Sequence, residues 1–113
     1  MEEKLKKKYC PMTETTFYTL ISLVAPNHGY GIMKFIHELT DGRVKMGTGT
    51  LYTMLGRLVE DQLISVIREE DGKKVYQITE DGRTLLLNEQ RRLYQQYENG
   101  KKILGLIVKQ PKT

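Results

Sequence analysis

The chain lacks several features that define common classes of protein. Its 113 residues include a single cysteine, Cys10, and no tryptophan. One cysteine excludes an internal disulfide framework and fits a reducing compartment, so we expect a cytoplasmic protein. No apolar stretch reaches the roughly 18 residues that indicate a membrane span, and the charged N-terminal segment does not resemble a secretory signal. We therefore expect one small domain without a membrane partner.

Patterns that would indicate an enzyme or a metal site are also missing. His28 and His37 lie far from Cys10 in the sequence, and the three do not have zinc-ligand spacing. The Gly-Thr-Gly-Thr run at residues 47–50 resembles a phosphate loop only superficially, because the Gly-x4-Gly-Lys-Ser/Thr pattern is absent. No paired carboxylates, nucleophile–base motif or cofactor fingerprint is visible. We predict a protein with no catalytic residues, no metal and no cofactor.

Positive charge is concentrated at the two ends of the chain. The formal net charge is +4, but residues 11–100 contain ten basic and twelve acidic side chains. Residues 1–10 hold four lysines, and residues 101–113 hold four more with no acid. Overall basicity is therefore weak support for nucleic-acid binding, which has to be argued from where individual charges lie.

Two amphipathic helices are predicted in the first part of the chain. The first begins after Thr13, a hydroxyl N-cap, and Met12 can pack on Phe17 as a hydrophobic staple. Pro26 and Asn27 end it. The second follows the His-Gly-Tyr-Gly run at 28–31 and ends near Asp41. The apolar spacing predicts two buried stripes: Phe17, Leu20, Ile21 and Val24, then Ile32, Phe35, Ile36 and Leu39.

The third predicted helix starts near Thr48, with Thr48 or Thr50 as the N-cap. One face is apolar, with Leu51, Met54, Leu55, Leu58 and Val59 at helical spacing. The other face carries Thr50, Tyr52, Thr53, Gly56 and Arg57. Small hydroxyls, a tyrosine, a bare glycine and an arginine suit close approach to a DNA major groove. The alternative is an ordinary amphipathic surface helix.

A β-hairpin is predicted directly after this helix. Residues 64–69 and 74–79 are β-prone and flank Asp71-Gly72, one of the strongest hairpin signals. Three short helices followed by a two-stranded hairpin is the order of a winged helix-turn-helix, in which the third helix enters the major groove. The expected fold class is therefore mainly α with a two-stranded wing.

A long helix is predicted from Thr79, its N-cap, to about Val108. Residues on one side of it follow a heptad rhythm: Leu86, Gln90, Leu93, Tyr97, Gly100, Leu104 and Ile107. Such a helix spans roughly 40 Å, more than a small domain can cover, so a second copy of the chain is the expected partner. The alternative is a helix that folds back on its own domain and frays after Gly100.

These elements divide the chain into four parts. Residues 1–11 form a basic N-terminal arm, 12–82 the winged helix-turn-helix, 83–108 the dimerisation helix and 109–113 a tail. The arm is expected to be mobile or partly helical and to be a solvated tail, and a segment that follows DNA phosphates is the alternative.

Three motifs in this order carry a family resemblance: HGYGI at 28–32, GTLYTMLGRLVEDQLI at 49–64 and VYQITEDG at 75–82. With them the chain resembles PadR-family transcriptional regulators over about residues 12–100. The single C-terminal helix is similar to the short subgroup of that family. The resemblance implies a homodimeric repressor that binds double-stranded DNA at a near-palindromic operator and is released by a small aromatic or phenolic effector.

The resemblance and the charge placement together name the expected sites. Residues expected to contact DNA are Tyr30, Lys45, Thr48, Thr50, Tyr52, Thr53, Arg57, Lys73 and Lys74. Residues expected in the dimer seam are Leu86, Leu93, Tyr97, Leu104 and Ile107. Tyr30 has an alternative role, because its ring could fill the core, and for Tyr76, which is not among these residues, the core is the favoured place.

The effector site and the function each keep a second interpretation. Drug-binding members of the short subgroup hold flat ligands between tryptophans, which this chain lacks. Tyr94 and Tyr97 could take a lesser version of that role, or could simply pack the dimer core. The alternative function is a winged-helix module that binds protein without sequence-specific DNA binding, in agreement with the near-neutral middle of the chain.

Overall fold

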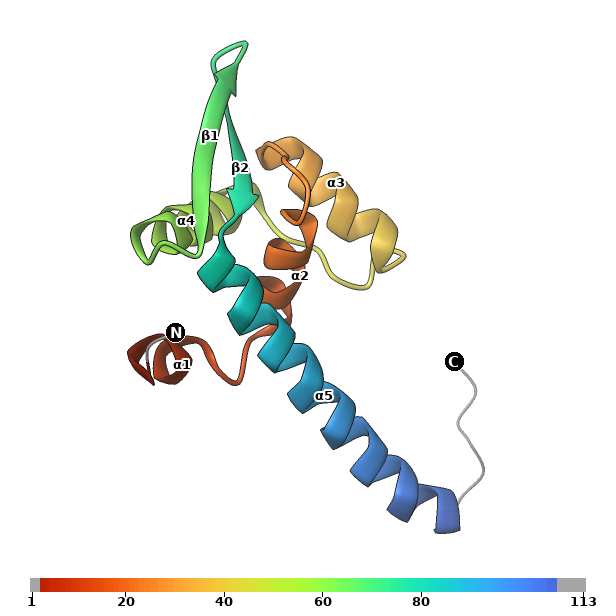
Figure 1. Cartoon of the computed structure of the whole chain (residues 1–113). Helices are drawn as coiled ribbons and strands as arrows, with labels where there is room; N and C mark the ends of the chain where they lie inside the picture. The colour runs from red at the N-terminus through yellow and green to blue at the C-terminus, as the bar shows by residue number, and fades with distance from the viewer. Residues whose placement is uncertain (1–2, 108–113) are drawn as a thin grey trace.

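The computed structural model describes residues 3–107, without the side chains of 106 and 107. It has five helices and one two-stranded sheet (Figure 1). In chain order these are α1 (Glu3–Tyr9), α2 (Glu14–Ser22), α3 (Gly29–Leu39), α4 (Thr48–Glu60), β1 (Ile64–Glu70), β2 (Lys73–Ile78) and α5 (Glu80–Ile107). This order confirms the winged helix-turn-helix with a long C-terminal helix. Within the described residues, no helix is long and apolar enough to cross a membrane.

The wing is the predicted antiparallel hairpin. β1 pairs with β2 from Ile64 opposite Ile78 to Glu70 opposite Lys73, with an irregularity between Val66 and Arg68. The turn residues Asp71 and Gly72 both have positive φ, 53° and 75°, as an Asp-Gly hairpin turn requires. Asn27 forms an isolated antiparallel bridge to β2, because its backbone exchanges two hydrogen bonds with Tyr76, of 3.0 and 2.8 Å. The segment before α3 is thereby attached to β2.

The core lies between α2, α3, α4, the base of the wing and the first turns of α5. Its most deeply buried apolar side chains come from all of these elements: Leu20, Leu23, Ile32, Ile36, Leu51, Leu55, Leu58, Leu63, Ile64 and Leu85. Gly82 marks the closest approach of α5, because a Cβ there would lie 2.1 Å from the Leu63 carbonyl oxygen. Only glycine fits this position without a shift of the backbone.

Helix α4 differs from the sequence-based prediction only at its N-terminal end. Its N-cap is Gly47, which makes no side-chain capping bond, so the prediction of Thr48 or Thr50 as the cap was wrong. Glycine is an accepted N-cap, and water can satisfy the exposed first N–H groups. The predicted apolar face is confirmed, with Leu51, Met54, Leu55 and Leu58 buried. Gln62, at φ 62°, then closes the helix as Leu63 N–H bonds the Leu58 carbonyl at 3.0 Å.

The predicted stripes of α2 and α3 are only half correct. Thr13 caps α2 as expected, accepting from Thr16 N–H at 3.2 Å, but the helix ends at Ser22. Leu23 turns into the core and Val24 is left 51% exposed, because helical spacing no longer holds beyond that end. On α3, Ile32 and Ile36 are buried while Phe35 and Leu39 are exposed. Among the described residues, no element covers these two side chains fully.

The N-terminal segment is a helix packed on the domain, not the expected solvated tail. Tyr9, at the end of α1, is only 7% exposed. Its hydroxyl donates to Asp61 at 2.5 Å, and Lys8 pairs with the same carboxylate at 2.7 Å. Burial of the Tyr9 ring and the two bonds to Asp61 offset the conformational entropy that is lost when the seven residues of α1 become ordered. Charge composition alone did not reveal this anchor.

Helix α5 leaves the body of the protein as a single rod (Figure 1). It passes through Gly100 as helix, in contrast to the alternative of fraying there. Its first turns are buried, and Leu86 belongs to the core of its own protomer. Further along, Leu93, Tyr94, Tyr97, Ile103 and Leu104 are exposed. The Ile107 side chain, Val108 and the 109–113 tail lie outside the described residues.

Glu89 ties α5 to the segment before α2. Its side chain is 2% exposed, accepts from Met12 N–H at 2.8 Å and pairs with Arg92 at 2.7 Å. The hydrogen bond from Arg92 lowers the carboxyl pKa, and the Met12 N–H adds to this against the opposing effect of burial. A charged acceptor with these partners is a strong link in a site with little water.

We predict that this link makes stability depend on pH in the acid range. Because the folded-state pKa of Glu89 is lowered, its contribution is present above the unfolded pKa of about 4.3 and is lost as the pH falls through the folded value. Glu89→Gln should lower the free energy of unfolding by about 1–3 kcal/mol at neutral pH. It should also make that free energy fall less steeply as the pH is lowered. Urea unfolding between pH 3 and 7 measures both effects. If the free energy of unfolding of the variant fell with decreasing pH as steeply as that of the wild-type protein, Glu89 would not be the group responsible.

Candidate nucleic-acid interface

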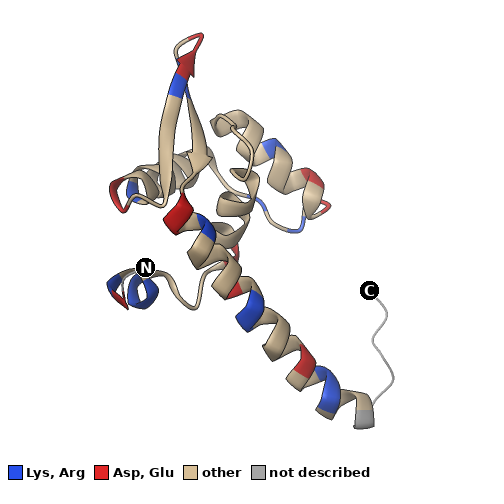
Figure 2. Cartoon of the chain, in the orientation of Figure 1, with Lys and Arg blue, Asp and Glu red and all other residues tan. Residues whose placement is uncertain are grey.

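The outer face of α4 is placed as predicted. Thr50, Tyr52, Thr53, Gly56 and Arg57 are all exposed while the opposite face is buried. Arg57 has no ion-pair partner within 4.0 Å among the described residues. Figure 2 shows that α4 carries little charge along most of its length. A long uncharged face with one unpaired cation can approach a polyanion without carboxylates in the way.

Tyr52 is held against the start of α3. A Cβ at Gly29 would lie 2.2 Å from the Tyr52 hydroxyl oxygen and 2.7 Å from the ring carbon that bears it. Only glycine leaves room for the phenol at this distance. The ring therefore has one side on α3 and remains 50% exposed on the other, which fixes where its hydroxyl points.

Two short-range features build the start of α3 and leave Tyr30 facing outward. His28 Nδ1 accepts from Gly31 N–H at 3.2 Å and caps the helix. A Cβ at Gly31 would lie 1.9 Å from Asn27 Oδ1. Tyr30 is consequently 65% exposed and does not fill the core, whereas Tyr76 is 6% exposed and does. Asn27, His28 and Gly29 are not among the predicted site residues; two glycines beside a histidine are the one signal for them in the sequence.

A hollow of about 350 Å³ brings residues from α3, α4 and the wing together. Its lining contains three tyrosines and two lysines: Tyr30, Tyr52, Tyr76, Lys73 and Lys74, with His28, Gly29 and Gly72. These come from separate parts of the sequence, and the fold gathers them on one surface. Hydroxyls and ammonium groups around a concave surface suit the oxygens of a phosphate backbone.

Acidic residues lie opposite both lysines of the wing. Lys73 lies opposite Glu70 and Lys74 opposite Glu69 in the hairpin register. Glu70 is itself paired with Arg68 at 2.5 Å. The tip is therefore mixed in charge, as Figure 2 shows, and both lysines also line the hollow.

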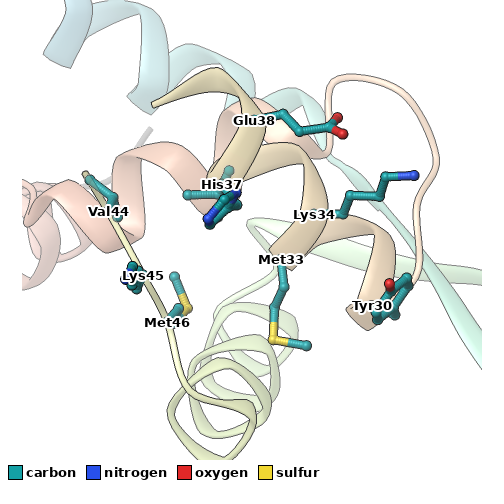
Figure 3. A pocket seen from close by; sticks show the side chains of 9 residues that line it. Tyr30, Met33, Lys34, His37, Glu38, Val44, Lys45 and Met46 are labelled. Atoms are coloured by element: carbon teal, nitrogen blue, oxygen red, sulfur yellow. The ribbon is translucent and has the colours of Figure 1, made fainter. Parts of the chain in front are cut away.

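A second hollow, of about 330 Å³, lies between α3 and the link that joins α3 to α4 (Figure 3). Met33 and Met46 project into it, and Lys34 and Glu38 extend away from the link. Lys45 and Tyr30 also line it, and Tyr30 lines the hollow beside the wing as well, whereas Lys45 does not. Arg43, in the same link, is engaged by Glu14 at 2.8 Å and by Tyr18 at 3.2 Å. Of the basic residues in this link, Lys45 remains exposed and without an ion pair among the described residues.

All predicted DNA-contact residues are exposed, but they fall into separate groups. Tyr52, Tyr30, Lys73 and Lys74 share the hollow beside the wing. Thr48, Thr50, Thr53 and Arg57 lie along α4, and Lys45 precedes it. Of the predicted seam residues, Leu93, Tyr97 and Leu104 are exposed and Leu86 is buried within its own protomer. Tyr94, 64% exposed, adjoins Tyr97 on the same helix.

Comparison with known proteins gives consistent matches. The model of the "Transcriptional regulator PadR-like family" matches residues 17–89. The transcriptional regulator YqjI of Escherichia coli is 41% identical over 56 residues, which are 50% of this chain and 27% of that protein. The chain thus spans about a quarter of the length of the curated relatives it matches.

Solved structures share the fold. A PadR-family transcriptional regulator from Eggerthella lenta is 22% identical, with a TM-score of 0.67 over 89% of this chain and 86% of that one. A transcriptional regulator from Clostridium thermocellum is 23% identical, with a TM-score of 0.60 over 95% of this chain and all of that one. At these identities the similarity shows the fold alone.

We predict that Gly29 and Gly56 respond in opposite ways to alanine. Gly29→Ala forces the half-exposed Tyr52 ring off the start of α3, and the lost contact should lower the free energy of unfolding by up to about 1 kcal/mol, the low end of the cost of overpacking. Gly56, in the middle of α4, has nothing within 4 Å of an added Cβ. Gly56→Ala should therefore raise stability by about 0.5–1 kcal/mol through helix propensity. Urea unfolding followed by circular dichroism compares the pair, and a neutral Gly29→Ala would refute the close contact.

Proposed function

Because the chain belongs to the PadR-like family of transcriptional regulators, we propose that it is a DNA-binding regulator that acts as a homodimer. The observation that carries this proposal is the surface formed by the outer face of α4 and the hollow beside the wing. Thr50, Thr53 and Arg57 lie on that face next to Tyr52. Proteins of this family regulate transcription and are not enzymes, and this surface suits binding more than catalysis.

In the proposed complex α4 enters the major groove and the wing follows the backbone. Thr50, Thr53 and Arg57 face base edges and phosphates, since hydroxyl and guanidinium groups bond both. The first N–H groups of α4, near Thr48 and Lys45, attract a phosphate through the partial positive charge of a helix N-terminus. Lys73, Lys74 and Tyr30 bind phosphates without reading sequence. Such a protein works in the compartment that holds the DNA, the cytoplasm in a cell without a nucleus.

The proposed dimer forms through the distal half of α5. The residues that α5 buries within its own domain include Leu85, Leu86 and Glu89. The same side of the helix continues into Leu93, Tyr97 and Leu104, which are exposed in the protomer. An apolar stripe that runs past the end of its own domain gains burial only from another molecule, and a second copy offers an identical stripe. Phe35 and Leu39 on α3 are further apolar surface that a partner could cover.

A two-fold dimer leads to the operator and to the mode of control. Two copies of α4 related by a two-fold axis match half-sites one helical turn apart, so we propose a near-palindromic operator. Occupancy of such a site near a promoter gives repression. Tyr94 and Tyr97 are proposed to bind a planar or phenolic effector between the two long helices. The alternative, in which both rings only pack the dimer, agrees equally well with their exposure in the protomer.

We predict that α4 and the wing contribute to DNA binding in different ways. Arg57→Ala should weaken binding to a duplex selected from random DNA by up to about a hundredfold, or about 1–3 kcal/mol. Lys73→Ala with Lys74→Ala should weaken binding to all duplexes and reduce the salt dependence, because backbone contacts release counterions. Fluorescence anisotropy at several salt concentrations measures both. Lys102→Ala, an exposed lysine on distal α5, is the control for lost charge.

The proposal fails if selection recovers no duplex, or if Arg57→Ala binds like the wild-type protein at physiological salt. A recovered motif without two-fold symmetry would keep DNA binding and remove the dimeric operator. Binding to protein partners with no dependence on salt would favour the winged-helix interaction module.

We predict that Leu93→Glu separates the dimer. The substitution puts a charge into the proposed seam, where its burial is unfavourable, so sedimentation at micromolar concentration should shift toward the 13.1 kDa species. DNA affinity should fall at the same time. Leu87→Glu is the matched control, because Leu87 is an exposed leucine of α5 that lies off the heptad positions. A wild-type protein that sediments only as a monomer would contradict the dimer.

A further inference from the structure

Helix α1 lies outside the residues that match the family model, 17–89, and it is fastened to the end of α4 at one residue. Lys8 Nζ and the Tyr9 hydroxyl both reach Asp61 Oδ2, at 2.7 and 2.5 Å. Tyr9 is buried, so the contact is held by a packed ring and is not a chance surface pair. We call these three residues, Lys8, Tyr9 and Asp61, the α1 clasp.

Asp61 occupies an unfavourable place for an acid. It is the C-cap of α4, and its N–H bonds the Arg57 carbonyl at 3.0 Å. The C-terminal end of a helix carries partial negative charge, which disfavours a carboxylate there. Glu60 beside it adds another negative charge. Lys8 supplies the cation that this helix end lacks.

Asp61 is also the natural partner of the one basic side chain in α4. Arg57 precedes it by four residues, the spacing at which helical side chains meet and form ion pairs. Yet Arg57 has no ion pair among the described residues, and the Asp61 oxygen that is bonded is bonded to α1. The pKa of the Asp61 carboxyl is lowered first by the hydrogen bond from Lys8, then by that from Tyr9, with a smaller contribution from Arg57. The guanidinium is thus close to the clasp but is not its partner.

We propose that Lys8 and Tyr9 are positioning residues for DNA binding, which occupy Asp61 and so leave Arg57 free to contact DNA. The inference rests on the proposed function of α4. Without the clasp, the Asp61 carboxylate is available to Arg57 and pulls it back along the helix. The same carboxylate, no longer neutralised, also repels phosphates that approach the end of α4. Both effects weaken binding, and both require the charge of Asp61.

Other charged groups line the space between α1, α4 and the start of α5. Lys4 lies there with Glu60 and Asp81. Lys6 and Lys7 are exposed on α1 and pair with none of the described residues. Figure 2 shows the concentration of lysine on this short helix. A general attraction of α1 for DNA is therefore the explanation that the test has to separate from the clasp.

The test compares two α1 variants that lose the same charge. In the first, Lys8→Met with Tyr9→Phe removes both bonds to Asp61 and keeps an apolar ring in the buried position. In the second, Lys7→Met removes one exposed lysine of the same helix. Fluorescence anisotropy with a duplex selected by the wild-type protein from random DNA gives the affinity at fixed salt. We expect a loss of about threefold to tenfold for the first variant and less than twofold for the second, as for two weak charge effects acting together.

The decisive measurement repeats the first variant in two backgrounds. With Asp61→Asn the loss should disappear, because the charge that captures Arg57 is gone. With Arg57→Ala the loss should shrink to the part that comes from repulsion by Asp61. Circular dichroism checks that each variant keeps its helix content. Asp61→Asn removes the charge of the carboxylate itself, so it tests the role of that charge even in a variant whose α1 has detached.

Two results would overturn the inference. Equal losses for the Lys8/Tyr9 variant and for Lys7→Met would show that α1 acts by its net charge alone. A loss that persists in full with Asp61→Asn would show that the clasp does not act through that carboxylate. Failure of the wild-type protein to bind any duplex would instead overturn the proposed function, and this inference with it.

Discussion

Burial of one side of α4 is the constraint on which the rest of the protein depends. Leu51, Leu55 and Leu58 are between 0 and 1% exposed, and full burial of such side chains contributes about 1.5–3 kcal/mol each. Rotation of the helix about its axis would expose them at that cost. The direction in which the outer face points, with Tyr52 and Arg57, is therefore set by the leucines of the opposite, buried face. The functional surface is the consequence of the core beneath it.

The sequence predicts what depends on local spacing and fails where distant segments meet. The apolar face of α4, the Asp71-Gly72 turn and the Thr13 and Thr79 caps follow from neighbouring residues, and the structure contains each of them. The α1 clasp joins residues 52 apart and the Glu89 link joins residues 77 apart, and no period in the sequence encodes such pairs. The outward-facing residues of the proposed DNA site could be predicted, but the hollow that gathers the wing lysines with three tyrosines could not.

The errors on α2 and α3 have different physical causes, because Val24 lies beyond the end of α2, whereas Phe35 and Leu39 lie on α3 and are left uncovered. Helical spacing indicates which residues are apolar on one side, but not what covers them. Phe35 and Leu39 fit the spacing of α3 and are exposed in one protomer, whereas Thr16 and Thr19 of α2 are polar and buried. Apolar residues that a domain leaves uncovered agree with a partner surface. Together with the stripe on α5, they favour a protein whose burial is completed by a second copy.

The link between α5 and α4 shows how a change at the dimer seam would reach the DNA-binding surface. Thr79, which caps α5, donates to the Gln62 carbonyl at 2.7 Å, and its N–H donates to the Leu63 carbonyl at 3.0 Å. Gly82 packs against that same carbonyl oxygen. Close-packed contacts of this kind do not stretch, so a tilt of α5 moves the end of α4 with it. A ligand between two α5 helices needs only to favour one crossing angle over another to change the spacing of the two α4 helices. In the proposed dimer, control of DNA binding from the seam would thus follow from rigid geometry and would not require α4 to unfold.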